Sequence, residues 1–425
     1  MQESFLHFVW QYRQFDHSAL ATTQGEPLHI DRPGIYNRAS GPDFSQARMV
    51  MAEVHWVGHV EIHIKASDWN THKHQHDPAY NNVILHVVWE NDREVYRQDG
   101  SQIPVLELKD RIDPLLISRF DGLMKERGTV LCQSQWQEVR ALTKFIMMDR
   151  ALTQRLERKS LAIRQMLRAN NGDWEETAYQ WLGMHFGFKL NNQSFLALTQ
   201  SLPLKILARK SNDVRQIEAM IFGIAGLLEN EPSDTYSAHL TREFTMLSAT
   251  FGLQEKILPG HIWKFAGARP ANFPTLRLAQ FAMLITAERN LFSMVLDAKG
   301  PRELMEKLRI APSDYWLSHY NFGKKKKSRQ NTMGKLAMEN LLINVAVPLM
   351  AAVGFEKDEQ ALIDKAVEWL QVIPAESNRI LNTWKEVGAP AQNAYDSQAM
   401  IELHNEFCSG KKCLSCQIGA EIMKS

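Results

Sequence analysis

Residues 60–65 read Val60-Glu61-Ile62-His63-Ile64-Lys65, and residues 83–88 read Val83-Ile84-Leu85-His86-Val87-Val88. Both stretches are rich in β-branched and other large apolar residues, which favours two strands buried within a sheet. Each stretch nevertheless contains ionisable side chains. Burying such a group is costly unless the group is paired or bound to a metal. The pattern therefore predicts a site within the sheet.

The predicted site combines carboxylates with imidazoles. Alternate residues of a strand point to the same side, so Glu61, His63 and Lys65 share one face. His86 can be their neighbour on the second strand, and Asp43 follows a Gly-Pro pair that bends the chain toward the strand end. Carboxylates suit Mg²⁺ or Mn²⁺, and imidazole also admits Zn²⁺. We therefore predict that Asp43, Glu61 and His86 bind a divalent ion.

The loop between the two strands adds further candidate ligands. Residues 72–77 contain His72, His74 and His76 and end at Asp77. These side chains can bind a metal or contact a phosphate, and we take His74 as a candidate substrate-binding residue. The alternative is an ordinary hydrophilic loop.

The sequence around these strands predicts an α/β domain over residues 1–135. Apolar residues at helical spacing predict an opening helix over residues 3–15 and another over residues 112–126. Val57 and Gly58 are expected to form a hairpin turn, and the strands are expected to form a sheet flanked by the helices. Strands are predicted at residues 28–36, 47–56, 59–66, 82–90 and 104–109.

The periodicity becomes helical after residue 135. Apolar residues recur at spacings of three and four, separated by Pro, Gly or Asn. Because no fixed period links the segments, residues 136–400 are expected to form a large all-α domain, followed by a cysteine-rich tail over residues 401–425. Helices are predicted at 141–169, 173–186, 192–208, 212–229, 236–251, 275–296, 301–309, 333–353, 358–372 and 376–387.

Two basic motifs interrupt the helical region. Arg269 and Arg277 flank a proline-containing loop, and arginine forks suit phosphate or carboxylate, although such loops also anchor domain interfaces. Lys324 and Lys325 begin a basic run over residues 324–329. Such a run is usually a solvated loop, but beside aromatic residues it also suits a nucleic-acid backbone. We take these four residues as candidate substrate-binding residues.

Three of the four cysteines, Cys408, Cys413 and Cys416, lie close together, and Cys132 lies far upstream. Clustered thiols in a chain expected to be cytosolic indicate a metal site rather than a disulfide framework. Cys132 and His404 are alternative fourth ligands for Zn²⁺ or an iron–sulfur cluster. If Cys132 takes part, the tail must fold back onto the N-terminal domain. The remaining alternative is a helical tail with reduced thiols.

Charge and hydropathy exclude several classes of protein. Lys+Arg 49 against Asp+Glu 48 gives a formal net charge of +1, so any binding of a polyanion requires local patches. The N-terminus lacks the pattern of a secretory signal. The apolar run over residues 341–354 is shorter than the ~20 residues needed to span a bilayer. We therefore expect a cytoplasmic protein with no membrane partner.

The N-terminal motif resembles the PD-(D/E)XK nuclease superfamily, which has the restriction-endonuclease-like fold. The resemblance rests on an acid after Gly-Pro, a hairpin, and a Glu-x-His-x-Lys strand. It implies that Asp43 and Glu61 hold one or two divalent cations. The lysine that positions or activates the attacking water in that superfamily is replaced by His63, and Lys65 follows on the same face. The resemblance thus implies that Asp43, Glu61, His63 and Lys65 are catalytic.

Other parts of the sequence carry further resemblances. Glu3 resembles a helix-borne acid found in some members of the superfamily. One distant cysteine with three near the C-terminus is similar to its iron–sulfur-bearing nucleases, although the spacing differs. The whole chain also resembles a bacterial family of uncharacterised proteins with a domain of unknown function.

Three functional hypotheses follow. The leading one is a metal-dependent nuclease or phosphodiesterase acting on DNA or RNA. A second is a catalytically degenerate nucleic-acid-binding or scaffold protein with a structural metal site, which the histidine at the lysine position favours. A third is a metalloenzyme acting on a small molecule, which the many histidines suggest.

Overall fold

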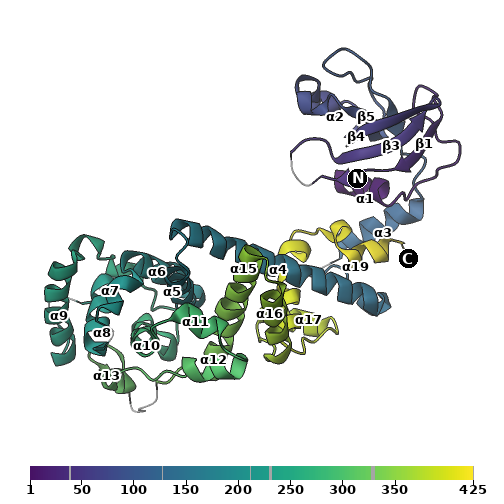
Figure 1. The fold of residues 1–425 in the computed structure, drawn as a ribbon. Helices are drawn as coiled ribbons and strands as arrows, with labels where there is room; N and C mark the ends of the chain where they lie inside the picture. Colours follow the sequence, from purple (N-terminus) through teal and green to yellow (C-terminus); the bar gives the residue numbers. More distant parts are fainter. Residues whose placement is uncertain (38–39, 127, 211, 229–231, 327–330, 425) are drawn as a thin grey trace. The chain divides into compact units, whose positions relative to one another are not determined.

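The structure is a computed structural model that describes residues 1–37, 40–126, 128–210, 212–228, 232–326 and 331–424. The chain divides into two compact units (Figure 1), one formed by Met1–Met148 with Leu403–Ser425 and the other by Asp149–Glu402. The first unit contains a mixed sheet with helices, and the second is largely helical. The predicted order of a mixed α/β region followed by a large helical region is therefore confirmed.

The first unit is built on a mixed sheet, which has six strands among the described residues. The strand order is β1-β3-β4-β5-β6, and β2 pairs with β3. The pairs β1/β3 and β3/β4 are antiparallel, whereas β4/β5 and β5/β6 are parallel. The strands are β1 (Leu28–Arg32), β2 (Ile35–Tyr36), β3 (Phe44–Met51), β4 (Val54–Lys65), β5 (Val83–Glu90) and β6 (Val105–Glu107).

The hairpin turn predicted at Val57 and Gly58 was wrong. β4 runs through both residues, and the turn is formed by Ala52 and Glu53, whose φ angles are 44° and 69°. Two consecutive left-handed residues match the two-residue turns that connect antiparallel strands. Gly58 is needed for close packing instead, because a Cβ there would lie 2.7 Å from the carbonyl oxygen of Asn82. Gly58 was therefore mistaken for a turn residue, although the close approach of the Asn82 segment is what requires a glycine there.

Short helices surround the sheet. α1 (Glu3–Gln11) packs against β4 and ends four residues before the predicted boundary (Figure 1). α3 (Pro114–Lys125) begins where the Asp113 carboxylate accepts a hydrogen bond from the Leu115 N–H, a typical N-cap. The remaining short elements are α2 (Asp68–Thr71), η1 (His74–His76), η2 (Pro78–Tyr80) and η3 (Trp136–Glu138).

The C-terminal segment belongs to the first unit. It consists of the π-helix η8 (His404–Cys408), η9 (Cys413–Ser415) and α19 (Gln417–Lys424). α19 packs against α3, and η9 packs against α1. The Glu421 carboxylate accepts hydrogen bonds from the backbone N–H and the guanidinium of Arg140 at 2.8–3.0 Å. The tail is thus folded back onto the N-terminal region.

The predicted helices are largely present, but two of them are each divided in two. The predicted helix 192–208 breaks at Leu202 and Pro203, because proline lacks the N–H that a helix interior requires. The predicted helix 275–296 breaks after Ala287. The helical elements are α4 (Ala141–Ala169), α5 (Trp174–Phe186), α6 (Phe188–Ser201), α7 (Leu204–Ala208), α8 (Val214–Ile224), α9 (Thr235–Phe251), η4 (Gln254–Lys256), η5 (Gly260–Ile262), η6 (Pro270–Asn272), α10 (Pro274–Ala287), α11 (Leu291–Leu296), α12 (Pro301–Leu308), α13 (Asp314–Ser318), α14 (Lys335–Leu341), the π-helix η7 (Leu342–Ala346), α15 (Val347–Lys357), α16 (Gln360–Val372), α17 (Arg379–Glu386) and α18 (Ala394–Leu403), with a small hairpin of β7 (His319–Asn321) and β8 (Lys324–Lys325).

One continuous apolar helix spans Lys335–Lys357 through α14, η7 and α15. By length and composition it could cross a membrane, but 78% of its most apolar window is buried. The core helices of soluble proteins have the same properties. This helix is therefore consistent with a soluble protein.

A buried ion-pair network stabilises the helical unit. The Glu402 carboxylate is 1% exposed and accepts hydrogen bonds from Arg155 at 3.1 Å and from Arg158 at 2.6 Å. Arg155 also donates to the Gln398 side chain at 2.7 Å. Both arginines lie on α4 and the acid lies on α18, so the network joins helices that are distant in sequence.

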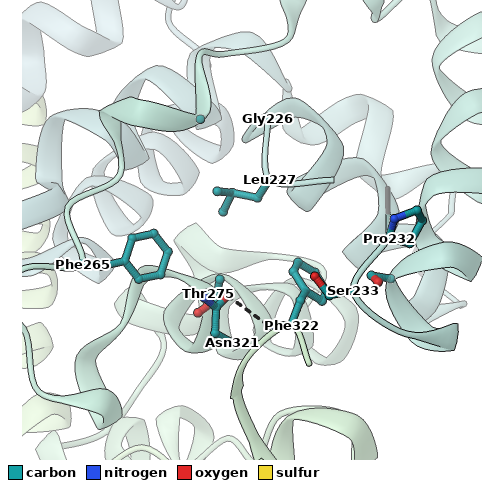
Figure 2. A pocket seen from close by; sticks show the side chains of 10 residues that line it. Gly226, Leu227, Pro232, Ser233, Phe265, Thr275, Asn321 and Phe322 are labelled. Atoms are coloured by element: carbon teal, nitrogen blue, oxygen red, sulfur yellow. Dashed lines mark hydrogen bonds between the residues drawn. The ribbon is translucent and has the colours of Figure 1, made fainter. Parts of the chain in front are cut away.

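The helical unit also contains a cavity of about 250 Å³ (Figure 2). Figure 2 shows Leu227, Phe265 and Phe322 among its lining side chains. The Asn321 side chain accepts a hydrogen bond from the Phe322 N–H at 2.9 Å. The described lining residues carry no ionisable side chain, so this cavity offers no charged group for a ligand.

Candidate functional site

β4 and β5 bring the ionisable residues of the sheet together. The two strands pair in parallel with Glu61 opposite His86. The exposed fractions of Glu61, His63 and His86 are 5%, 1% and 0%. Nδ1 of His63 lies 2.8 Å from Nε2 of His86. Of the three residues predicted to share a face, Glu61 and His63 are buried and close to each other, whereas Lys65 is exposed at the end of β4. His86, the predicted neighbour on the second strand, contacts His63.

Asp43 is fixed beside Glu61 by two reciprocal hydrogen bonds. The Asp43 carboxylate accepts from the Ile62 N–H at 2.9 Å, and the Asp43 N–H donates to Glu61 Oε2 at 3.1 Å. Each acid therefore binds the backbone of the segment that carries the other. This arrangement places two carboxylates side by side, as expected for the residue after the Gly-Pro pair.

Three imidazoles gather on the other side of Glu61. One ring nitrogen from each of His63, His72 and His74 lies within 4.8 Å of the others. His63 Nε2 is 3.0 Å from His72 Nδ1. Lys73 adopts a left-handed φ of 64°, which reverses the chain between the two loop histidines. His63 is buried, His74 is half-buried and His72 is exposed, so the group opens to solvent at His72.

The same carboxylate also faces two of these imidazoles. Glu61 Oε1 lies 3.3 Å from His74 Nε2 and 3.6 Å from His63 Nε2. Glu61 therefore connects the acidic side of the site, at Asp43, to the histidine side.

Aromatic side chains hold the histidines in place. The His74 ring stacks on Tyr80, with centroids 3.8 Å apart. Trp69 is fully buried and contacts the rings of both His74 and His86, at centroid distances of 5.3 Å and 5.5 Å. The Trp69 indole donates to the Tyr96 carbonyl at 3.1 Å, which fixes the indole in turn. The loop histidines are thus positioned by packing.

Burial determines the charge states within the site. Burial, together with repulsion from the neighbouring imidazoles, lowers the pKa of His63 to about 2, and burial lowers the pKa of His86 to about 3. Burial raises the pKa of Glu61, with His74 partly opposing the shift. Both buried imidazoles are therefore neutral at neutral pH, which is the form that binds metals.

α1 contributes a residue that the sequence did not reveal. His7 Nε2 lies 3.2 Å from Asp43 Oδ2 and 3.8 Å from Glu3 Oε1. Burial acts to lower the pKa of His7, but the hydrogen bond and charge of Asp43 outweigh it and raise the pKa. The available signal was the four-residue spacing between Glu3 and His7, which places both on one face of the helix.

Other parts of the histidine-rich loop do not join the site. His76 is exposed at the end of η1. The Asp77 carboxylate accepts from the Ala79 N–H and caps η2, so it has a local structural role. Of the loop residues named from the sequence, His72 and His74 are the two that reach His63.

The four cysteines converge within the first unit. Cys132 and Cys416 are buried, and Cys408 and Cys413 are partly buried. The pKa of Cys132 is raised to about 12 by burial and by the charges of Cys416 and Cys413. Burial and the other three thiols likewise raise the pKa of Cys408. These electrostatic effects of the thiols on one another indicate that the four cysteines lie in the same region of the first unit.

The predicted basic residues lie in the helical unit. Arg277 is buried in α10, while Arg269 is exposed just before η6. Lys324 and Lys325 form the exposed strand β8. Residues 327–330 of the predicted basic run lie outside the described residues.

Comparison with known families gives one result. The sequence model described as "Protein of unknown function (DUF2851)" matches residues 3–379 of the 425-residue chain. The chain belongs to the DUF2851 family. This confirms the expected resemblance to an uncharacterised family. Neither the curated proteins nor the solved structures give a match. The DUF2851 match includes the histidine site and ends before the three C-terminal cysteines.

Proposed function

We propose that this protein is a metal-dependent phosphodiesterase that acts on nucleic acid. One observation carries the proposal: three imidazole nitrogens within 4.8 Å of one another, beside a buried carboxylate. The resemblance of the Asp43 and Glu61 motif to PD-(D/E)XK nucleases suggests the reaction. The exposed side chain of Lys73, which lies between His72 and His74 in the chain, suits an anionic substrate.

The spacing of the donor atoms fits a bound ion. Ligands at the usual 2.0–2.1 Å from a tetrahedral ion lie about 3.3 Å apart. The separations among Glu61 Oε1, His63 Nε2, His72 Nδ1 and His74 Nε2 include 3.0, 3.3 and 3.6 Å. If His63 donates its Nδ1 proton to His86, its Nε2 lone pair faces the other donors. Imidazoles combined with carboxylate suit Mn²⁺ or Zn²⁺ better than Mg²⁺.

The residues then have distinct roles. A divalent ion held here would stabilise negative charge on a phosphate and lower the pKa of bound water. Glu61 and the three histidines would hold the ion, and Asp43 fixes Glu61 through its backbone N–H. His7 contacts the Asp43 carboxylate and can exchange a proton with it. The exposed His72 gives substrate access to the site.

One observation favours the alternative of a degenerate, nucleic-acid-binding member of the superfamily. His63 stands where the superfamily has its catalytic lysine, and both of its nitrogens face other imidazoles. His63 therefore cannot serve as a general base in the way that the lysine does. In this alternative the ion is structural, and nucleic acid binds without being cleaved.

The decisive experiment measures metal content and cleavage with matched variants. Purified protein is expected to retain Mn²⁺ or Zn²⁺ and to cleave DNA or RNA when the ion is present. His72→Ala and His74→Ala should lower cleavage at least about a hundredfold, because loss of a ligand exceeds the usual cost of losing an outer-sphere contact. His76→Ala, in the same loop, should behave as the unaltered protein. Metal retention and binding without cleavage would support the alternative, and no bound metal would rule out both.

We also propose that Cys132, Cys408, Cys413 and Cys416 bind a metal as thiolates. His404 is the alternative fourth ligand, through its Nε2, because its Nδ1 faces Asn405 Oδ1 at 3.3 Å. The resemblance to the iron–sulfur-bearing nucleases favours an iron–sulfur cluster over zinc.

Metal analysis of protein purified without oxygen tests the thiolate site. Iron with a visible chromophore is expected in the unaltered protein and in His404→Ala, and Cys132→Ser should lose both. Zinc with the same dependence on Cys132 would keep the site but change the metal. Protein with an intact fold that holds neither metal would refute the site.

A further inference from the structure

Arg277 is a buried cation whose hydrogen-bond partners among the described residues are neutral. It is 5% exposed on α10. Its guanidinium donates to Gln280 Oε1 at 2.8 Å and to Asn272 Oδ1 at 2.6 Å, and it lies 4.6 Å from the Phe188 ring centroid. Its Nε has no hydrogen-bond partner among the described residues. Burial lowers the pKa of Arg277 to about 10, and no carboxylate offsets the effect.

The other deeply buried arginine of the helical unit has the partner that Arg277 lacks. Arg155 is 12% exposed and is paired with the Glu402 carboxylate at 3.1 Å. An unpaired buried charge costs several times more than a paired one, because the desolvation penalty is not repaid. The environment of Arg277 therefore suits a cation that receives its counter-charge from outside the chain.

A large cavity lies beside this guanidinium. Its volume is about 1010 Å³, and its described lining contains no aspartate or glutamate. One acid pairs with a lining lysine without itself lining the cavity: Glu339 Oε1 lies 3.7 Å from Lys335 Nζ. The cavity is thus strongly cationic. Its positively charged lining residues are Lys189, Arg269, Arg277, Lys326 and Lys335.

We propose that this cavity binds a small phosphorylated molecule of about nucleotide size, with its phosphate on Arg277. Guanidinium groups bind phosphate oxygens with strong, charge-assisted hydrogen bonds. The volume lies at the upper end of the usual range for small-molecule sites, roughly 300–1,000 Å³. The amides of Asn191, Asn272 and Asn331 and the ring of Tyr320 also line the cavity and can contact a base or sugar.

The depth of Arg277 distinguishes this ligand from a nucleic-acid backbone. A strand that crosses a surface meets exposed cations such as Lys324 and Lys325, which do not line the cavity. A terminal phosphate can enter a cavity and reach a side chain that is 5% exposed. The inference rests on the helical unit alone and does not depend on the proposed metal site.

Titration of the whole protein with inorganic phosphate and with adenosine monophosphate tests the proposal. Both are expected to raise the melting temperature and to bind in calorimetry, and the nucleotide should bind at least about tenfold more tightly because it fills more of the cavity. Chloride at equal ionic strength should have no effect. Absence of binding by both phosphate probes, or binding of single-stranded DNA alone, would overturn the proposal.

Variants distinguish a binding role for Arg277 from a structural one. Arg277→Met removes the buried charge, so without phosphate its melting temperature should equal or exceed that of the unaltered protein. Its affinity for phosphate should fall at least about tenfold. Arg269→Gln should weaken binding several-fold, whereas Arg302→Gln, outside the cavity, should not. Unaltered phosphate affinity in both Arg277→Met and Arg269→Gln would refute the assignment.

Discussion

His63→Ala is expected to abolish metal binding and metal-dependent cleavage. His63 is the buried member of the histidine group, and its two nitrogens connect His72 on the solvent side to His86 in the core. Without it, the remaining ring nitrogens no longer surround one point. We expect the metal content to fall to background and cleavage to fall about 10³-fold or more, since the ion supplies most of the charge stabilisation. Metal analysis and single-turnover cleavage measure these effects.

His86→Ala provides a graded comparison. His86 contacts His63 and supports its orientation, so its loss should weaken metal affinity about 10–100-fold without removing the site. Added metal should then restore cleavage in His86→Ala but not in His63→Ala. His55→Ala, an exposed histidine on the same strand, serves as the control. Equal metal content in His63→Ala and His55→Ala would contradict the assignment of His63 as a ligand.

The face that carries the site could be predicted from the sequence because strand periodicity is local. Glu61 and His63 are two residues apart on an apolar strand, which fixes their common side. The parallel register that places His86 opposite Glu61 depends on the crossover between the strands, and periodicity does not encode it. The structure supplied this register and the contact between the two histidines.

Three residues enter the site through tertiary packing: His72 and His74, which the sequence named as possible ligands, and His7, which it did not reveal. His72 and His74 reach His63 because Lys73 adopts a left-handed conformation, which its sequence does not signal. His7 lies on a helix that packs against β4, and an ordinary amphipathic helix gives no indication of that contact. In both cases the deciding information is the packing of segments distant in sequence.

The cysteines show what the spacing of residues in the sequence can predict and what it cannot. Three thiols close in sequence predicted a metal site, with Cys132 as the fourth ligand and His404 as the alternative. The fold of the tail separates them, because it brings the three C-terminal thiols close to Cys132. The tertiary structure therefore favours Cys132 as the fourth ligand of the proposed thiolate site.

Glu402→Gln is expected to destabilise the helical unit more than any other single charge removal in it. The substitution removes the carboxylate that pairs with Arg155, at 12% exposure, and Arg158 loses the same partner. Removing one partner of a buried pair costs about 3–5 kcal/mol of unfolding free energy, because an uncompensated charge remains buried. Urea unfolding followed by helical circular dichroism measures the loss.

Glu356→Gln is the matched control, because Glu356 pairs with Arg164 on the same long helix, α4, but 35% of its side chain is exposed. Exposed pairs contribute about 1 kcal/mol or less, since water solvates the charge that remains. Each variant removes a carboxylate that pairs with an arginine of α4. Because Glu402 is buried and Glu356 is partly exposed, the two losses of unfolding free energy should differ by about 2 kcal/mol or more. Equal losses would show that Arg155 and Arg158 find other partners or water when Glu402 is neutralised. The same comparison bears on Arg277. The loss of unfolding free energy in Glu402→Gln measures how far a buried arginine without its paired carboxylate destabilises this helical region.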